Sequence, residues 1–277
     1  MPVILWLPPL AAFVISFVTS MAGISGAVLL APFQMSFLGA AGPAVSATSL
    51  LFNVIATPGA VYRYFREGRL VFPLAMLLTA GTVPGTLLGV WIRVHWLSDA
   101  NRFKIFCALL LLYLGIRLLL DKPRENAAPS GSDWVARSGH ASWRTLILEF
   151  HGARYECKTV AISVVSFAVG ILGGAYGIGG GSILAPFLVT IVGLPLYAVS
   201  GPTLLATFVT SAVGVAFYGR LNAGPDQQLA LLMGAGGVVG MYCGARFQRH
   251  VPVRLLQRIL GTVLIAVSVS YLSAAWR

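Results

Sequence analysis

Charged residues are scarce in this sequence. Asp, Glu, Lys and Arg make up 10% of the chain and hydrophobic residues 57%, whereas soluble domains are about a quarter charged. Two long stretches, 1–62 and 159–219, contain no Asp, Glu, Lys, Arg or His. Because one bilayer crossing takes about 20 apolar residues, each stretch is long enough for about three crossings, or for one crossing and a re-entrant pair. This scarcity excludes a soluble domain and predicts an all-α integral membrane protein.

Residues that build metal or catalytic sites are also few. The three cysteines, Cys107, Cys157 and Cys243, show no paired spacing, so we expect neither a disulfide framework nor a metal cluster. The four histidines lie outside the apolar runs and have no metal-ligand spacing. No Lys-Ser or Lys-Thr follows the glycines at 177–181, which excludes a phosphate-binding P-loop. We therefore predict no catalytic residues, no metal and no cofactor, and not an enzyme.

Acidic residues are absent from the apolar runs. All eight lie in polar segments: Glu67, Asp99, Asp121, Glu125, Asp133, Glu149, Glu156 and Asp226. Proton and sodium pumps usually carry a carboxylate at membrane depth. A cation site in the core is therefore not expected, unless backbone carbonyls form it.

Basic residues dominate the polar segments, and the net charge is +11. In a membrane protein this excess is expected in cytoplasmic loops, so nucleic acid is not a predicted partner. The predicted partners are the lipid bilayer and a small anion. No basic segment precedes the first apolar run, so we expect no cleaved signal peptide.

One motif occurs twice, 154 positions apart: Gly23-Ile-Ser-Gly-Ala-Val-Leu-Leu-Ala-Pro-Phe33 and Gly177-Ile-Gly-Gly-Gly-Ser-Ile-Leu-Ala-Pro-Phe187. Each glycine costs a helix interior roughly 1 kcal/mol relative to Ala, so both copies predict a broken helix, with the breaks at 23–26 and 173–181. Backbone freed from helical bonding is tolerated at membrane depth only inside protein or along a cavity. Two such breaks at matching places are typical of a transporter's binding site.

The repeat divides the chain into a first membrane repeat (1–120), a hydrophilic linker that we expect to be cytoplasmic (121–158) and a second membrane repeat (159–277). Each half has a broken or re-entrant helix pair and about three crossing helices, or else five crossings. Both counts are odd, which predicts inverted halves. A parallel repeat with four crossings per half is the alternative.

The charged loops predict an orientation. The linker and the loops at 63–69 and 246–258 would be cytoplasmic, with both termini outside. The loop expected at 93–104 then carries Arg93, Arg102 and Lys104 on the wrong side.

Two further patterns bear on packing. Within the linker, 145–150 is expected either to pair with 154–158 as a hairpin through His151-Gly152 or to lie on the membrane surface. Glycines spaced four apart, at 81, 85 and 89 and at 236, 240 and 244, favour close helix packing. That packing lies within one chain or between two, so a homodimer stays an alternative.

The expected chemistry of the core is anion binding by donors. Half-helices that start near Gly26 and Gly181 present backbone N–H groups and positive dipole ends. The following helix of each half adds hydroxyls and amides on one face. These predicted substrate-binding residues are Gly23, Ser25, Gly26, Ser49, Asn53, Thr57, Gly177, Gly179, Gly180, Gly181, Ser182, Thr203, Thr207, Thr210 and Ser211.

The predicted site residues and two nearby tyrosines also have ordinary structural interpretations. Ser and Thr hydroxyls often bond to their own helix or join helices in membranes. Tyr176 and Tyr218 are candidates for gating or coordination, although core or interfacial packing is the more ordinary role.

The paired motifs, the hydroxyl-bearing helix after each and the two-half layout resemble the sulfite exporter TauE/SafE family of bacterial membrane proteins. The resemblance covers nearly the whole chain except the linker. In the first copy, Ser25 and Ala27 stand where glycines stand in the second. The resemblance implies export of sulfite, organosulfonates or related anions across the bacterial inner membrane.

A membrane potential that is negative inside drives an anion outward by about 2.3 kcal/mol per charge per 100 mV. Export driven by this potential needs no proton-binding carboxylate, although a proton gradient is a second possible driving force. A sodium- or metal-linked carrier and a non-transporting membrane enzyme or sensor are the alternative functions.

Overall fold

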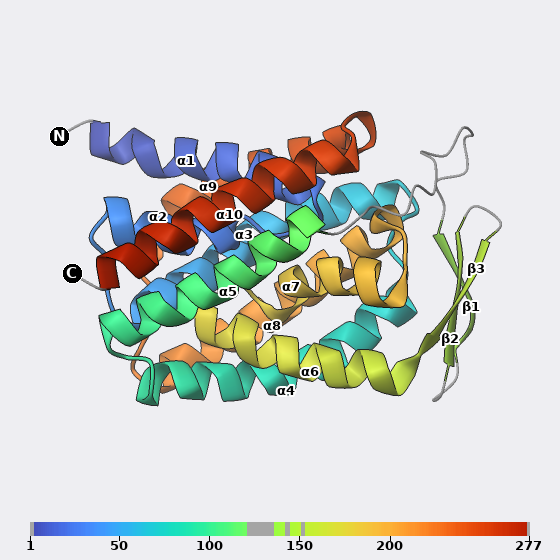
Figure 1. Ribbon diagram of the computed structural model, residues 1–277, viewed down its shortest axis with the longest axis horizontal. Helices are drawn as coiled ribbons and strands as arrows, with labels where there is room; N and C mark the ends of the chain where they lie inside the picture. Colours follow the sequence, from blue (N-terminus) through green and yellow to red (C-terminus); the bar gives the residue numbers. More distant parts are fainter. Residues whose placement is uncertain (1–2, 121–135, 142–144, 151–152, 276–277) are drawn as a thin grey trace.

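The computed structural model describes residues 3–120, 136–141, 145–150 and 153–275. Its first half contains α1 (Val3–Met21), α2 (Ala27–Phe37), α3 (Pro43–Arg66), α4 (Phe72–His95) and α5 (Ala100–Leu120). Its second half contains α6 (Thr159–Tyr176), α7 (Gly180–Phe187) with a π-helical turn η1 (Leu188–Val192), α8 (Leu196–Arg220), α9 (Gln227–Phe247) with a 3-10 turn η2 (Gln248–His250), and α10 (Val253–Ala275). The helices form one elongated bundle (Figure 1).

Seven of the described helices are long and apolar enough to cross a membrane: α3, α4, α5, α6, α8, α9 and α10. The protein is therefore a multi-pass, all-α membrane protein. The short α2 and α7 follow the two glycine motifs and are too short to cross a bilayer alone, since a crossing takes about 20 residues.

Both predicted breaks are present. The second lies at Gly177–Gly179, where Gly177 has φ +97° and Gly179 has φ +77°. Residues with side chains rarely adopt this left-handed conformation, so these glycines end α6 and redirect the chain into α7. We expected the break to begin at Gly173, but Gly173 and Gly174 lie within α6. Gly174 instead faces α4, where an added Cβ would lie 2.8 Å from the Thr86 Cα.

Three expected loop boundaries are wrong. Arg93 lies inside α4 rather than in a loop, and Arg63 and Arg66 lie in the last turn of α3. At the other end of the chain, α10 begins at Val253 instead of Ile259. Arg254 and Arg258 are exposed there while Leu256 is buried. Helical periodicity thus keeps both charges on the outer face of α10, and no separate basic loop is needed.

The glycine series bring helices of the two halves together within one chain. A Cβ added at Gly85 of α4 would lie 3.0 Å from the Gly170 Cα of α6, and one added at Gly240 of α9 would lie 3.1 Å from the Phe13 Cα of α1. Since 154 positions separate α1 from α6 and α4 from α9, the α4–α6 and α1–α9 pairs are equivalent. The contacts of α3 with α9 and of α8 with α4 are equivalent in the same way.

The last helices of the halves run in opposite directions. Ser268 Oγ of α10 donates to the Ala108 carbonyl of α5 at 2.7 Å, and Gly261 packs near Leu119. In Figure 1, α5 and α10 lie side by side, and the C-terminal end of α10 is at the same end of the bundle as the start of α5. Antiparallel equivalent helices are what inverted halves require; the inverted relation itself stays a prediction.

A three-stranded antiparallel sheet lies at one end of the bundle, opposite the two termini (Figure 1). Its strands β1 (Ala136–Ala141), β2 (Thr145–Phe150) and β3 (Ala153–Lys158) are hydrogen-bonded in chain order. The pairing of β2 with β3, from Thr145↔Lys158 to Phe150↔Ala153, confirms the expected hairpin. The expected turn His151-Gly152 lies outside the described residues. Strand β1 was not predicted from the sequence.

Candidate functional site

The two breaks meet through one side chain, Asn53 on α3. Ser25 Oγ of the first break donates to Asn53 Oδ1. Asn53 Nδ2 donates to the Ile178 carbonyl of the second break at 2.6 Å and to Ser211 Oγ of α8 at 3.3 Å. Asn53, Ser25 and Ser211 are all 0% exposed. One buried amide thus joins both breaks and both hydroxyl-bearing helices.

The first glycine of each break touches a serine of the opposite half. A Cβ added at Gly177 would lie 2.6 Å from the Ser46 Cα, and one added at Gly23 would lie 2.6 Å from Ser200 Oγ. Because Ser46 and Ser200 are themselves 154 positions apart, the two contacts are equivalent. Each break therefore packs against the start of the long helix of the other half.

The remaining glycines of the second break hold its backbone against two helices. An added Cβ at Gly179 would lie 2.6 Å from Ser211 Oγ, and one at Gly181 would lie 2.6 Å from the Thr207 nitrogen. A Cβ added at Gly180 would lie 2.8 Å from the Thr82 Cβ of α4. In the first break, a Cβ added at Gly26 would lie 2.5 Å from the Ser16 Oγ of α1. Side chains at these positions would push the breaks away from the candidate site.

The threonines on α8 are buried but donate to their own helix. Thr203, Thr207 and Thr210 donate to the carbonyls four residues earlier at 2.9, 2.8 and 2.7 Å. Thr57 of α3 likewise donates to the Asn53 carbonyl. A hydroxyl has one proton to give, so these four residues have no donor left for an anion in this conformation. The hydroxyl groups of these threonines therefore bond to their own helices, as the structural interpretation expects. That interpretation does not explain why the threonines lie beside the breaks.

Ser49 takes part in a separate buried pair. Gln34 of α2 donates to Ser49 Oγ at 2.8 Å, and Gln34 Oε1 is a buried atom without a hydrogen-bond partner. Ser182 lies in α7, and its side chain is outside the described positions. Sequence reasoning missed Gln34, Ser46 and Ser200. An available signal was their polarity within runs that hold no charged residue.

The buried tyrosines fasten helices together. Tyr218 OH donates to the Gly174 carbonyl at 3.1 Å, and Tyr64 OH donates to the Ser20 carbonyl at 3.2 Å. These two bonds are equivalent across the repeat. Tyr176 OH donates to the Val28 carbonyl at 2.8 Å. In this conformation Tyr176 and Tyr218 are core residues with satisfied hydroxyls.

The electrostatics of the junction favour negative charge. The buried starts of α2 and α7 bring positive helix ends to it. No acidic residue of the described chain lies inside a membrane-spanning helix. Among the described residues, no group of three or more His, Cys, Asp or Glu side chains is placed to hold a metal ion.

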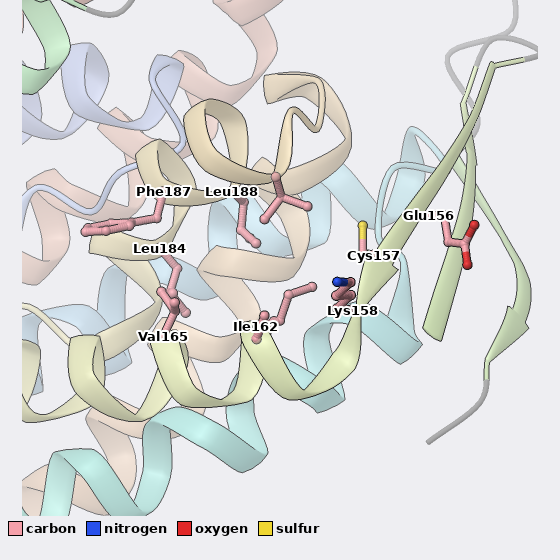
Figure 2. A pocket seen from close by; sticks show the side chains of 10 residues that line it. Glu156, Cys157, Lys158, Ile162, Val165, Leu184, Phe187 and Leu188 are labelled. Atoms are coloured by element: carbon pink, nitrogen blue, oxygen red, sulfur yellow. The ribbon is translucent and has the colours of Figure 1, made fainter. Parts of the chain in front are cut away.

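A separate cavity lies near the sheet. It has a volume of about 280 Å³ and is lined mainly by apolar residues of α6, α7 and η1, with Cys157 and Lys158 of β3 at its border. Figure 2 shows the Glu156 carboxylate pointing away from the helices. Burial raises the pKa of the Cys157 thiol to about 11, so that thiol is neutral at physiological pH. None of the predicted site residues lines this cavity.

The model of the sulfite exporter TauE/SafE family matches residues 9–271. The chain belongs to this family. The match spans both breaks and both long helices, so the junction at Asn53 is part of a TauE/SafE fold. No solved structure matches the chain.

Two curated relatives are named as membrane transporters. The probable membrane transporter protein YunE of Bacillus subtilis (strain 168) is 22% identical over 190 residues, which cover 64% of this chain and 64% of the relative. That match therefore spans less than two thirds of YunE. A probable membrane transporter protein of Xylella fastidiosa (strain 9a5c) is 24% identical over 273 residues, which cover 95% of this chain and 92% of the relative.

Proposed function

We propose that this TauE/SafE protein is a bacterial inner-membrane exporter of small sulfur-containing anions, such as sulfite, a sulfonate or a related species. One observation carries the proposal: the Asn53 amide links the two breaks at the contact between α3 and α8, in a region without acidic side chains. The family's description and the names of the relatives support transport.

The anion would bind where the breaks meet. Asn53 Nδ2 now donates to the Ile178 carbonyl and Ser211 Oγ. An anion that separates the breaks would take over this donor, together with the backbone N–H groups at the start of α7. Because the buried donors are satisfied within the protein when the anion is absent, opening and closing of the junction would accompany transport. We propose an alternating-access or channel-like mechanism.

The driving force would be the membrane potential or a proton gradient. A potential that is negative inside favours anion exit by about 2.3 kcal/mol per charge per 100 mV. The absence of acidic side chains from the spanning helices of the described chain makes the potential the simpler choice.

Sulfite flux from proteoliposomes tests this function. Purified protein in sulfite-loaded vesicles should release sulfite when a potassium diffusion potential is imposed, and protein-free vesicles should not. Flux that needs a sodium gradient and ignores the potential would instead identify a sodium-linked carrier. No flux of sulfite or of sulfonates under any gradient would leave the enzyme or sensor alternative.

Two variants test the site. Asn53→Leu should abolish the flux because it removes the amide that joins the breaks. Thr207→Val should lower it, because a methyl group would replace the hydroxyl that lies against Gly181 of the second break. Thr79→Val is the control, since Thr79 of α4 also donates to its own helix but is only half-buried. If both Asn53→Leu and Thr207→Val carried wild-type flux, the assignment of the site would be wrong.

A further inference from the structure

A fully buried cation lies at one end of the contact between α3 and α8. Arg93 of α4 is 0% exposed. Its Nε donates to Ser46 Oγ at 3.1 Å, its Nη2 donates to the Gly42 carbonyl at 2.6 Å, and its Nη1 donates to the Leu97 carbonyl. The Phe103 ring lies 3.6 Å from the guanidinium carbon. Every partner of this charge is neutral.

No carboxylate of the described residues forms an ion pair with Arg93. Within the described part of the chain, the ion pairs involve Arg63 and Arg69, both with Glu67. Burial of a charge without a counter-ion is costly, so such a residue calls for a functional reason.

The opposite end of the α3–α8 contact holds a buried arginine that is paired with a carboxylate. Arg69, 1% exposed, pairs with Glu67 at 3.0 Å and donates to Gln248 Oε1 at 2.6 Å. Gln248 in turn donates to Ser200, the serine equivalent to Ser46. Arg69 lies just before α4 and Arg93 lies near its end, and the 24 residues of α4 span about 36 Å. Each end of the α3–α8 contact thus has one buried arginine beside the equivalent serine, and one of the two charges lacks a counter-ion.

Arg93 is connected to the second break. Ser46, which accepts from Arg93, donates to the Ala175 carbonyl at 3.3 Å, and its backbone lies against Gly177. A guanidinium has five N–H donors in a planar fork, and three of the five are used here. Among the described residues, the other two N–H groups have no hydrogen-bond acceptor.

We propose that Arg93 binds the transported anion at the end of the α3–α8 contact away from the sheet, as a subsite for an oxyanion with two or more oxygens; this inference rests on the proposed function. The anion supplies the missing negative charge, and the guanidinium fork matches a pair of oxygens on one sulfur atom. The subsite lies between the outside, as the predicted orientation has it, and the junction at Asn53. At this place Arg93 would set the affinity for the anion and favour oxyanions over chloride.

The test compares Arg93 with an exposed arginine at the same end. Arg93→Gln should raise the half-saturating sulfite concentration in the proteoliposome assay by about tenfold or more, because it removes hydrogen bonds to a charged group. Arg93→Lys keeps the charge but loses the fork, so it should lower the preference for sulfite over chloride, with chloride measured as an inhibitor. Arg102→Gln is the matched control and should leave both values unchanged, since Arg102 is exposed at the start of α5.

The outcomes separate this inference from the proposed function. An unchanged half-saturating concentration in Arg93→Gln overturns the inference and leaves the function standing. If Arg93→Gln does not fold, a wild-type sulfite-to-chloride preference in Arg93→Lys overturns it instead. If the wild-type protein shows no sulfite flux, the function fails. Thermal stabilisation of the detergent-solubilised protein by sulfite, sulfate, phosphate and chloride then decides: stabilisation that Arg93→Lys weakens supports the subsite, and its absence overturns it.

Discussion

The two breaks occupy equivalent places but approach the centre of the protein in different ways. In the first break, the Ser25 side chain reaches Asn53 and also accepts from the Ala27 N–H at 3.1 Å. In the second break, Gly179 stands at the position of Ser25, and its bare backbone lies against Ser211 and Thr207 of α8. One half thus offers a hydroxyl and the other offers backbone, and we propose that the anion approaches the backbone of the second break more closely.

Gly181→Val should have the largest effect. A Cβ at Gly181 would meet the Thr203 carbonyl and the Thr207 nitrogen, both parts of a helix that cannot shift easily. Overpacking costs about 1–3 kcal/mol or more, so we expect little folded protein, measured by the yield of monodisperse protein in detergent. Gly219→Ala is the control, because nothing lies within 4 Å of its added Cβ. Equal yields of the two variants would contradict a close approach of the second break to α8.

Asn53→Leu should have the next largest effect. It leaves the Ile178 carbonyl and Ser25 Oγ without their buried partner, at about 1–3 kcal/mol for each unsatisfied group. Besides the loss of flux expected above, the midpoint of thermal unfolding should fall by several degrees. Asn53→Asp separates the two readouts: it keeps an acceptor for Ser25 and places a negative charge in the anion site. We expect it to abolish flux; normal flux in Asn53→Asp would count against an anion site.

Ser25 and Gly179 stand at equivalent positions of the two breaks, and giving each break the residue of the other should lower the stability by unequal amounts. Gly179→Ser introduces a Cβ at φ +77° and 2.6 Å from Ser211 Oγ, and we expect a loss of about 1–3 kcal/mol in stability. Ser25→Gly introduces no clash. It loses a hydroxyl that accepts from the Ala27 N–H at the start of α2 and donates to Asn53, and we expect a loss of about 1 kcal/mol. Thermal unfolding of both variants checks the order, and the reverse order would show that the first break is the more tightly packed.

Thr210→Val should have the smallest effect. Thr210 donates to the Ala206 carbonyl of its own helix, and valine has nearly the same shape. We expect a change in sulfite flux of less than about twofold and a stability change within about 1 kcal/mol. A loss as large as that of Asn53→Leu would show that the α8 face contacts the anion directly, and the two breaks would then differ less than their geometry indicates.

Much of the fold could be predicted because it depends on local composition. Two charge-free stretches placed the membrane helices, and the repeated glycine motif placed both breaks to within a few residues. The hairpin of β2 and β3 was also expected, whereas β1 lacks the apolar alternation that would mark a strand. Helix ends at charged residues were less predictable. Arg93 and Arg69 look like loop residues by composition, and only their neighbours bury them.

The sequence by itself determined that this protein lies in a membrane, that it has two related halves, and that each half has a glycine-loosened break, because composition, repetition and helix propensity act over short distances along the chain. Only the tertiary structure decided that one amide, Asn53, joins both breaks, because its partner Ile178 lies 125 positions away. The structure also decided that Arg93 is a buried charge without a carboxylate, since that property depends on α3, α4 and α5 together.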